Sequence, residues 1–250
     1  MAEETKFPTE VIDLPSEGRL YVKESPLASG KLELKYMTAK EEDILTSQNL
    51  IKKGVVIDQL LKSLIVDKTI DLDDLILGDK NAIMVAARIL AYGPKYEVDV
   101  INPNTNEPFR HEFNLADCPF IKLPENVKRN EFTTQLPVSK AVVKFKILNG
   151  RDERMISKEV ESLKKLNKSI SKDLTTRLKY TIISIDGKDE QSFVYNFVDN
   201  MLSRDSLHLR TEINKVQPDI DLSQEIDIEG EAVKVDIPMT ADFFWPSTAI

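Results

Sequence analysis

The chain has 250 residues, of which 41% are hydrophobic and 30% are charged, so it can bury a substantial core in one or two domains. Its formal net charge of −8 argues against nucleic acid or an anionic membrane as the partner, because binding to phosphate requires an excess of Lys and Arg. The single cysteine, Cys118, permits no internal disulfide, which fits assembly in a reducing cytoplasm.

The N-terminal third predicts an extended arm followed by a strand and helices. Residues 1–30 are rich in Pro, Ser and Glu, and their first seven residues lack the apolar core of a signal peptide. Leu32 and Leu34 then alternate with polar residues, as in a half-buried strand, and Thr38 and Glu41 have the spacing of a helix capping box. Apolar side chains at helical spacing predict further helices over 54–66 and 82–92.

The middle of the chain predicts a β-hairpin and then a linker. Apolar residues alternate with polar ones over 96–100 and again over 109–113, on either side of a turn at 102–106. Three prolines separated by charged residues mark 117–137 as a semi-rigid linker. No apolar run is long enough to predict a membrane span.

The second part repeats the order of strand, helices and hairpin. A strand is predicted over 142–148, helices over 152–166, 172–183, 192–202 and 204–216, and a closing hairpin over 220–237. We therefore expect an α+β protein that consists of an N-terminal arm (1–30), a first α+β half (31–116), the linker (117–137), a second α+β half (138–238) and an aromatic C-terminal tail (239–250).

A short internal repeat supports two similar halves. Residues 32–42 align without gaps with residues 143–153, and a Leu-Pro pair precedes each copy, with about eleven extra residues between that pair and the strand in the first copy. A duplicated scaffold favours a protein that presents surfaces over one built around a single catalytic pocket. Because the match is of low complexity, chance resemblance remains the alternative.

Residues with catalytic or metal-binding potential are few. A packed or half-exposed imidazole is the simpler interpretation of both His111 and His208, and a buried or incidental thiol is the simpler one for Cys118. One Cys and two scattered His cannot form a conventional zinc site, and the acidic run 71–74 lacks the later ligands of a calcium loop. With eight glycines and no phosphate-binding motif, nothing in the sequence supports an enzyme.

Two segments are candidates for binding a partner. Adjacent aromatic residues in the tail cannot all face one core in a regular helix or strand, which predicts a surface anchor; alternatively, they fold back over the closing hairpin. The arm could dock in extended form on a neighbouring subunit, or it could lie as a strap on its own domain. The candidate residues are Phe243, Phe244, Trp245 and Pro246 in the tail, and Leu14, Pro15 and Tyr21 in the arm.

Two charged runs have simpler interpretations. The acidic residues of the closing hairpin are expected to form a solvated edge that deters unwanted pairing, or to meet a basic partner surface. The basic run is interpreted as a solvated helix face. The acidic residues are Asp219, Asp221, Glu225, Asp227 and Glu229, and the basic ones are Lys164, Lys165, Lys168 and Lys172.

An ordered series of segments resembles the opening of the T4-type bacteriophage baseplate proteins. It begins with Leu14-Pro15-Ser16-Glu17-Gly18, Met37-Thr38-Ala39-Lys40-Glu41-Glu42-Asp43-Ile44-Leu45 and Leu50-Ile51-Lys52-Lys53-Gly54. It continues with Asp73-Asp74-Leu75, Leu77-Gly78-Asp79-Lys80-Asn81-Ala82 and Tyr92-Gly93-Pro94-Lys95-Tyr96-Glu97-Val98. The resemblance covers residues 10–115 well and the rest more loosely, through 150–153 and 243–246.

The resemblance implies a baseplate hub subunit or hub assembly protein. Such a protein would bind other hub or tail proteins in the host cytoplasm during assembly and would have no enzymatic activity. The alternatives are a transient assembly chaperone absent from the virion and a hub-associated hydrolase. Proteins of this type often carry Cys-Pro-x-Cys at the hairpin tip, whereas this chain has Asn102-Pro103-Asn104-Thr105, so we expect neither zinc nor another cofactor.

Overall fold

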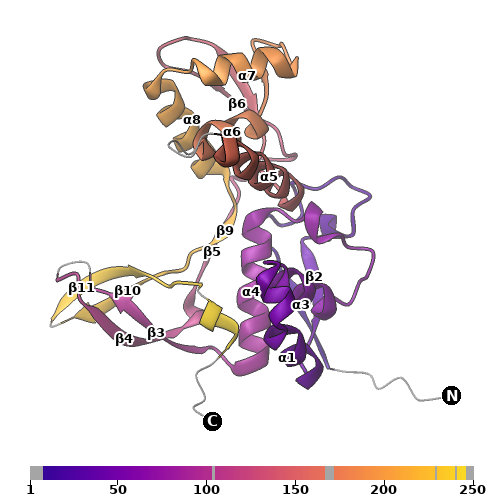
Figure 1. The fold of residues 1–250 in the computed structure, drawn as a ribbon, viewed down its shortest axis with the longest axis vertical. Helices are drawn as coiled ribbons and strands as arrows, with labels where there is room; N and C mark the ends of the chain where they lie inside the picture. The colour runs from indigo at the N-terminus through magenta and orange to yellow at the C-terminus, as the bar shows by residue number, and fades with distance from the viewer. Residues whose placement is uncertain (1–7, 103–104, 167–171, 229, 240, 246–250) are drawn as a thin grey trace.

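The structure, a computed structural model, describes residues 8–102, 105–166, 172–228, 230–239 and 241–245. It consists of two bodies joined by a narrow neck, with a pair of β-hairpins projecting from one of them (Figure 1). The first unit contains the strands and helices of residues 9–92 and both projecting hairpins, at 95–114 and 223–236. The second unit contains the strands and helices of residues 132–216. Within the described residues, no helix is long and apolar enough to cross a membrane.

Helices and small antiparallel sheets alternate along the chain, which confirms the predicted α+β class. The α-helices are α1 (Ala39–Thr46), α2 (Gln48–Lys52), α3 (Val56–Leu64), α4 (Leu77–Tyr92), α5 (Gly150–Leu166), α6 (Asp173–Thr181), α7 (Gln191–Asp199) and α8 (Ser203–Val216). The 3₁₀ turns are η1 (Pro26–Ser29), η2 (Leu72–Asp74), η3 (Leu115–Asp117) and η4 (Ala241–Phe244). The strands are β1 (Thr9–Asp13), β2 (Lys31–Lys35), β3 (Lys95–Ile101), β4 (Pro108–Asn114), β5 (Phe120–Ile121), β6 (Phe132–Gln135), β7 (Val142–Phe145), β8 (Ile182–Ile185), β9 (Asp219–Ile220), β10 (Ser223–Ile228) and β11 (Glu231–Asp236).

Each unit has its own apolar core. In the first unit, α3 buries Leu60, Leu61 and Leu64 on one face, because apolar residues recur at the helical period along it. In the second unit, Phe145 from β7 and Leu209 from α8 lie at the centre of a separate core. The third strand of that unit, β8, begins within the segment 172–183 that the sequence predicts as helical, because consecutive β-branched residues favour a strand there.

The closing hairpin belongs to the first unit, which corrects the boundaries expected from the sequence. The apolar side chains of β10 and β11, including Ile226 and Val235, pack in the first core although the sequence assigns 138–238 to a second half. The chain returns because β9 pairs antiparallel with β5 in the neck and lies against α4 (Figure 1). Gly78 of α4 permits this approach, since a β-carbon there would lie 1.8 Å from the Pro218 carbonyl oxygen.

The two copies of the sequence repeat make matching backbone contacts. β1 pairs antiparallel with β2, and β6 pairs with β7. After each first strand, the Leu of the Leu-Pro pair is buried and its N–H donates across the hairpin: Leu14 to the Gly30 oxygen (2.8 Å) and Leu136 to the Ala141 oxygen (2.9 Å). The repeat therefore corresponds to equivalent local geometry, while a duplication of the whole fold stays an interpretation.

The helix starts of the two copies also match. The Glu41 carboxylate accepts the Thr38 N–H (3.0 Å), and the Asp152 carboxylate accepts the Asn149 N–H (3.3 Å). Each carboxylate also pairs with the lysine that leads into its helix; these pairs are Lys35–Glu41 (2.6 Å) and Lys146–Asp152 (2.7 Å). Burial alone would raise the pKa of Glu41, but hydrogen bonds from Lys35, Ser63 and Thr38 outweigh it and lower that pKa to about 2.

Candidate partner-binding surfaces

The tail aromatics that the sequence predicts at the surface are mostly buried. Phe243 is 1% exposed and lies edge-on to Tyr96, with ring centroids 5.1 Å apart, and Phe244 is also buried. Trp245 is half-buried against the same core, and Pro246 lies outside the described residues. Phe243 and Phe244 therefore fold back onto the first core, which is the alternative that the sequence left open, because the short turn η4 directs both rings inward. Binding of a partner by the tail stays a prediction.

The arm residues are also integrated into the first unit. Leu14 and Pro15 are buried, and the Tyr21 hydroxyl donates to Asp79 Oδ2 (2.6 Å) while accepting the Ile76 N–H (3.1 Å). The segment from β1 to Tyr21 therefore lies as a strap on its own unit, which is the alternative that the sequence left open. Binding of a partner by Leu14, Pro15 or Tyr21 stays a prediction.

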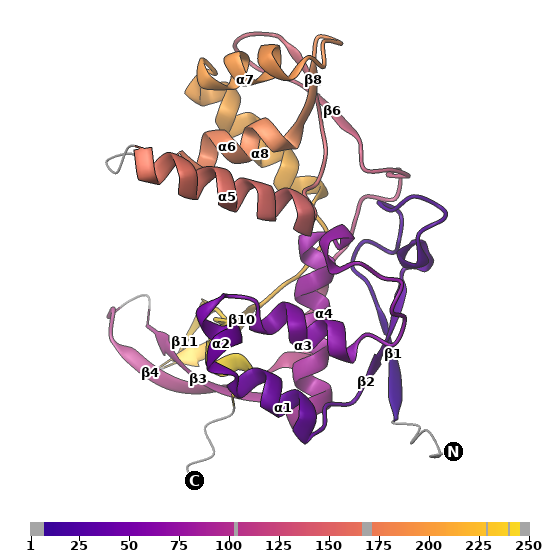
Figure 2. The same ribbon diagram turned by 45° about the vertical axis from the view of Figure 1, so that its right-hand side comes forward.

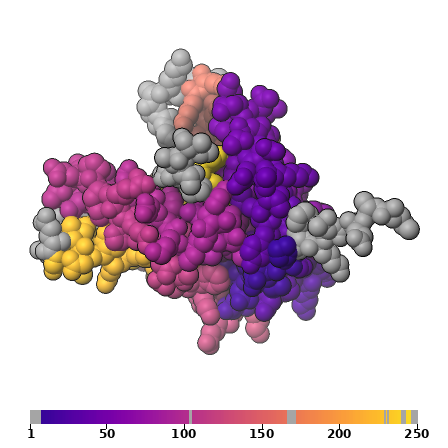
Figure 3. Space-filling model, turned by 90° about the horizontal axis from the view of Figure 1, so that it is seen from below, coloured from indigo at the N-terminus to yellow at the C-terminus, as the bar shows by residue number. Residues whose placement is uncertain are grey.

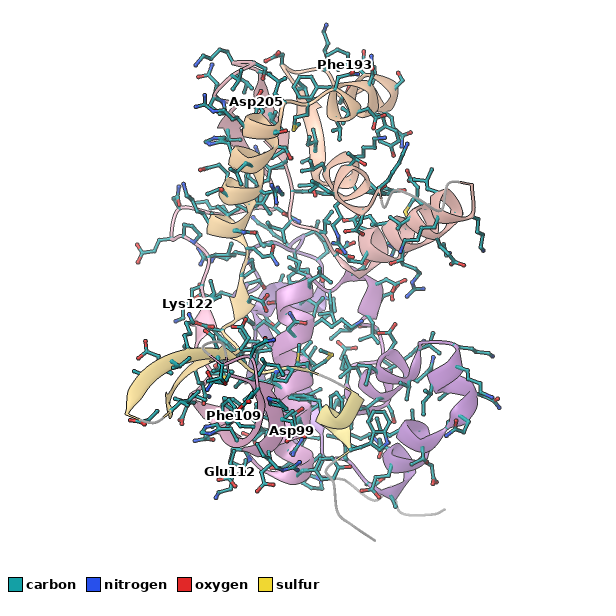
Figure 4. The ribbon with its side chains drawn as sticks, turned by 60° about the vertical axis from the view of Figure 1, so that its left-hand side comes forward. Asp99, Phe109, Glu112, Lys122, Phe193 and Asp205 are labelled. Carbon is teal, nitrogen blue, oxygen red and sulfur yellow. The ribbon has the colours of Figure 1, made fainter. Side chains whose placement is uncertain are left out.

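A buried aspartate anchors the loop after the Leu-Pro pair in each unit. Asp79 lies in the first turn of α4, three residues after Ile76, and its carboxylate accepts the Ser16 N–H (2.9 Å) and the Ser16 hydroxyl (2.6 Å). Asp205, at the same place in α8 (Figure 4), accepts the N–H groups of Val138 (2.8 Å) and Ser139 (3.0 Å). Burial raises the pKa of Asp79, whereas at Asp205 the hydrogen bonds outweigh burial and lower the pKa. Both carboxyl groups position backbone, and neither lies in an open cleft.

The histidines and the cysteine lie in structural environments. His111 lies on β4 between Phe109 and Phe113, with ring centroids 6.3 and 4.7 Å away. His208 lies on α8 in the other unit, where its Nε2 is 3.1 Å from the Thr134 hydroxyl. Burial raises the pKa of the Cys118 thiol, which disfavours the reactive thiolate. Among the described residues, no group of three or more His, Cys, Asp or Glu side chains could hold a metal ion.

The acidic run 71–74 takes part in the contact between the units. Arg151 from the start of α5 pairs with Asp74 (2.8 Å), and Arg154 pairs with Asp73. Asp73 and Arg154 line an open groove of about 840 Å³ between α3, η2 and α5. Charged residues make up half of its lining and include the Lys80–Asp58 pair (2.6 Å), so the groove lacks the predominantly apolar lining typical of a small-molecule site.

The most exposed candidate surface is the pair of hairpins β3–β4 and β10–β11, which we call the β-arm. Its two hairpins lie side by side and project from the first unit (Figures 1 and 3). Buried Val98 and Val100 of one hairpin share a core with Val233 and Val235 of the other. Each sheet has only two strands, so every strand of the β-arm has one edge without a strand partner among the described residues.

The outward faces of the β-arm carry charge. Asp99 and Glu112 lie on the outer side of β3–β4 (Figure 4), and Glu225 and Asp227 are exposed on β10. The sequence predicts both hairpins but places them in different halves, so it misses the surface that they form together. The alternation of apolar and polar residues in both hairpins was the available signal for this surface, because it gives each hairpin one apolar face that another element must bury.

Comparison with known proteins gives one family. The model of the family described as T4 bacteriophage base plate protein matches residues 9–245. No curated protein and no solved structure matches the chain.

Proposed function

We propose that this chain, which belongs to the T4 bacteriophage base plate protein family by a match over residues 9–245, is a non-enzymatic component of the baseplate hub. It acts by binding other tail proteins while the hub and baseplate assemble in the host cytoplasm, and it then remains in the tail of the virion. The family supports a baseplate component with a structural role, and the hub is the more specific part of the proposal.

The β-arm is the observation that carries this proposal. Two long hairpins project together from the first unit and offer open strand edges, which are ready acceptors for a strand of another protein. The residues with catalytic potential are spread over both units and pack as structural side chains. A binding role follows more directly from this arrangement than turnover does.

Tagged protein purified from infected cells tests the proposal. Mass spectrometry of tail intermediates and of mature particles should find this chain together with hub proteins in both fractions. Its presence in intermediates alone would make it a transient assembly chaperone that is absent from the virion. Its absence from every tail protein complex would contradict the baseplate hub role.

A matched set of variants separates binding from catalysis. The double variant His111→Gln, His208→Gln should retain incorporation into tails, since neither imidazole serves a reaction in this proposal. Charge reversals on the exposed β10 face, Glu225→Lys and Asp227→Lys, should reduce capture of hub proteins if the β-arm binds them. Loss of function in the histidine variant, with the fold intact by circular dichroism, would instead favour a hydrolase.

A further inference from the structure

The two units contact each other through surfaces that are not equivalent. Ile76, just before α4 of the first unit, forms an antiparallel bridge with Asn149, just before α5 of the second. The Gly150 N–H donates to the Leu75 oxygen across this contact (2.9 Å). Ile76 is 2% exposed and packs with Ile147. The contact therefore joins the α4 start of the first unit, Leu75 and Ile76, to the α5 start of the second unit, Asn149 and Gly150 (Figure 2).

The second unit carries a counterpart of the α4 start that the described residues leave exposed. Leu202 precedes α8 as Ile76 precedes α4, and their backbone angles agree, with φ −67° and ψ 143° against φ −68° and ψ 143°. Each is followed after three residues by the buried aspartate that anchors the Leu-Pro loop, Asp205 or Asp79. Unlike Ile76, Leu202 is 52% exposed. A large apolar side chain therefore lies open where its counterpart is sealed.

The loops after the Leu-Pro pairs explain why this surface is open. In the first unit the loop is long and places Tyr21 on Ile76, whose N–H donates to the Tyr21 hydroxyl. In the second unit the loop spans only 138–141, and its Val138 is itself exposed beside the α8 start. Leu202 and Val138 are therefore two apolar side chains near the α8 start that the described residues of the second unit leave exposed.

The first unit carries the counterpart of the α5 start. By the sequence repeat, Thr38 and Ala39 at the start of α1 correspond to Asn149 and Gly150. Ala39 is exposed, and its N–H has no acceptor among the described residues. Likewise, the Met201 carbonyl, the counterpart of the Leu75 carbonyl, has no donor there. Each chain therefore presents one unused surface of each kind.

We propose that a second copy of this chain binds at Leu202, so that the α8 start of one copy contacts the α1 start of the next. The contact repeats between chains the one that already joins the two units within a chain. Because it is head to tail, it closes into a ring or continues as a filament, according to the rotation between copies. The proposal does not depend on the hub function, since purified protein alone should show it.

Two substitutions remove one surface each and leave the fold intact. Ala39→Pro removes the N–H donor at the first position of α1, where proline is well accommodated; Thr38 before it is already extended, with φ −124° and ψ 172°. Leu202→Glu places a charge on the apolar surface of the α8 start. The control is Leu207→Glu, a matched change at a residue of α8 that is 57% exposed and away from the proposed contact.

Sedimentation velocity over a wide concentration range tests the proposal. The unmodified chain and Leu207→Glu should associate with rising concentration, whereas Ala39→Pro and Leu202→Glu should each stay monomeric with unchanged circular dichroism and melting temperature. An equimolar mixture of these two variants should form a one-to-one dimer and nothing larger, because each retains the surface that the other lacks. A monomeric unmodified chain, unaffected association of either variant, or a monomeric mixture would overturn the proposal.

Discussion

Replacing Phe243 with alanine tests whether the C-terminal aromatics belong to the core of the first unit. The ring is 1% exposed and lies edge-on to Tyr96 and Phe244, with centroids 5.1 and 5.2 Å away. Truncating a fully buried Phe costs about 3–5 kcal/mol, through lost transfer free energy and the cavity left behind. Because two edge-on ring pairs are lost with it, we expect a loss of about 4 kcal/mol in the free energy of unfolding.

The single tryptophan provides a local reporter for this experiment. Trp245 packs half-buried on the first core, so its fluorescence follows the docking of the tail during urea unfolding. For a chain of this length, the expected loss corresponds to a fall in melting temperature of about 8–16 °C. Far-UV circular dichroism follows the helices of both units, so a transition that Trp245 fluorescence reports in full and dichroism only in part would show that the separate core of the second unit is less affected.

The matched control is Phe193→Ala on α7. That ring is 37% exposed, and the Lys188 ammonium lies 4.9 Å from its centroid, so its truncation should cost about 1 kcal/mol or less. If Phe243→Ala cost no more than this control, the tail would not be core, and a role as a free surface anchor would regain support.

Three further predictions concern single groups. The lowered pKa of Glu41 stabilises the folded state; this contribution is fully present above the unfolded pKa of 4.5 and is lost as the pH falls through the folded pKa of about 2. Glu41→Gln should therefore lower the free energy of unfolding by about 3 kcal/mol at pH 7 and flatten the pH dependence of urea unfolding between these two values. Asp205→Ala removes the acceptor of the part-buried hydrogen bonds from the Val138 and Ser139 N–H groups and should destabilise the second unit by about 1–3 kcal/mol in total, measured by circular dichroism during urea unfolding. Gly78→Ala places a β-carbon 1.8 Å from the Pro218 oxygen and should cost about 1–3 kcal/mol in thermal unfolding, more than Gly150→Ala, where the nearest atom is 3.0 Å away.

Local patterns in the sequence predicted local structure well. The alternation over 96–100 and 109–113 corresponds to β3 and β4, and the spacing of Thr38 and Glu41 corresponds to the start of α1. These features depend on residues close together in the chain, where period and capping chemistry are decisive. The repeat is visible for the same reason, since it lies in one strand and the helix start that follows it.

Long-range packing decided what the sequence could not predict. The closing hairpin has the same pattern wherever it docks, and only the β5–β9 pairing brings it back to the first unit. The buried Asp79 resembles an ordinary acidic residue in the first turn of a helix, yet it accepts hydrogen bonds from Ser16. The inference about Phe243 and Phe244 assumed a regular helix or strand, whereas a 3₁₀ turn allows both rings to face the same core.

The eleven extra residues in the first loop connect the repeat to assembly. A contact between the α4 and α8 starts would have used the same kind of surface on both units and would have left the α1 and α5 starts unused. Here the long loop of the first unit seals Ile76 under Tyr21, and the short loop of the second leaves Leu202 uncovered. The difference in loop length therefore accompanies a polar arrangement, in which the unused α1 start lies in the first unit and the unused α8 start lies in the second. A component with that polarity can direct the order in which copies or partners are added to an assembly.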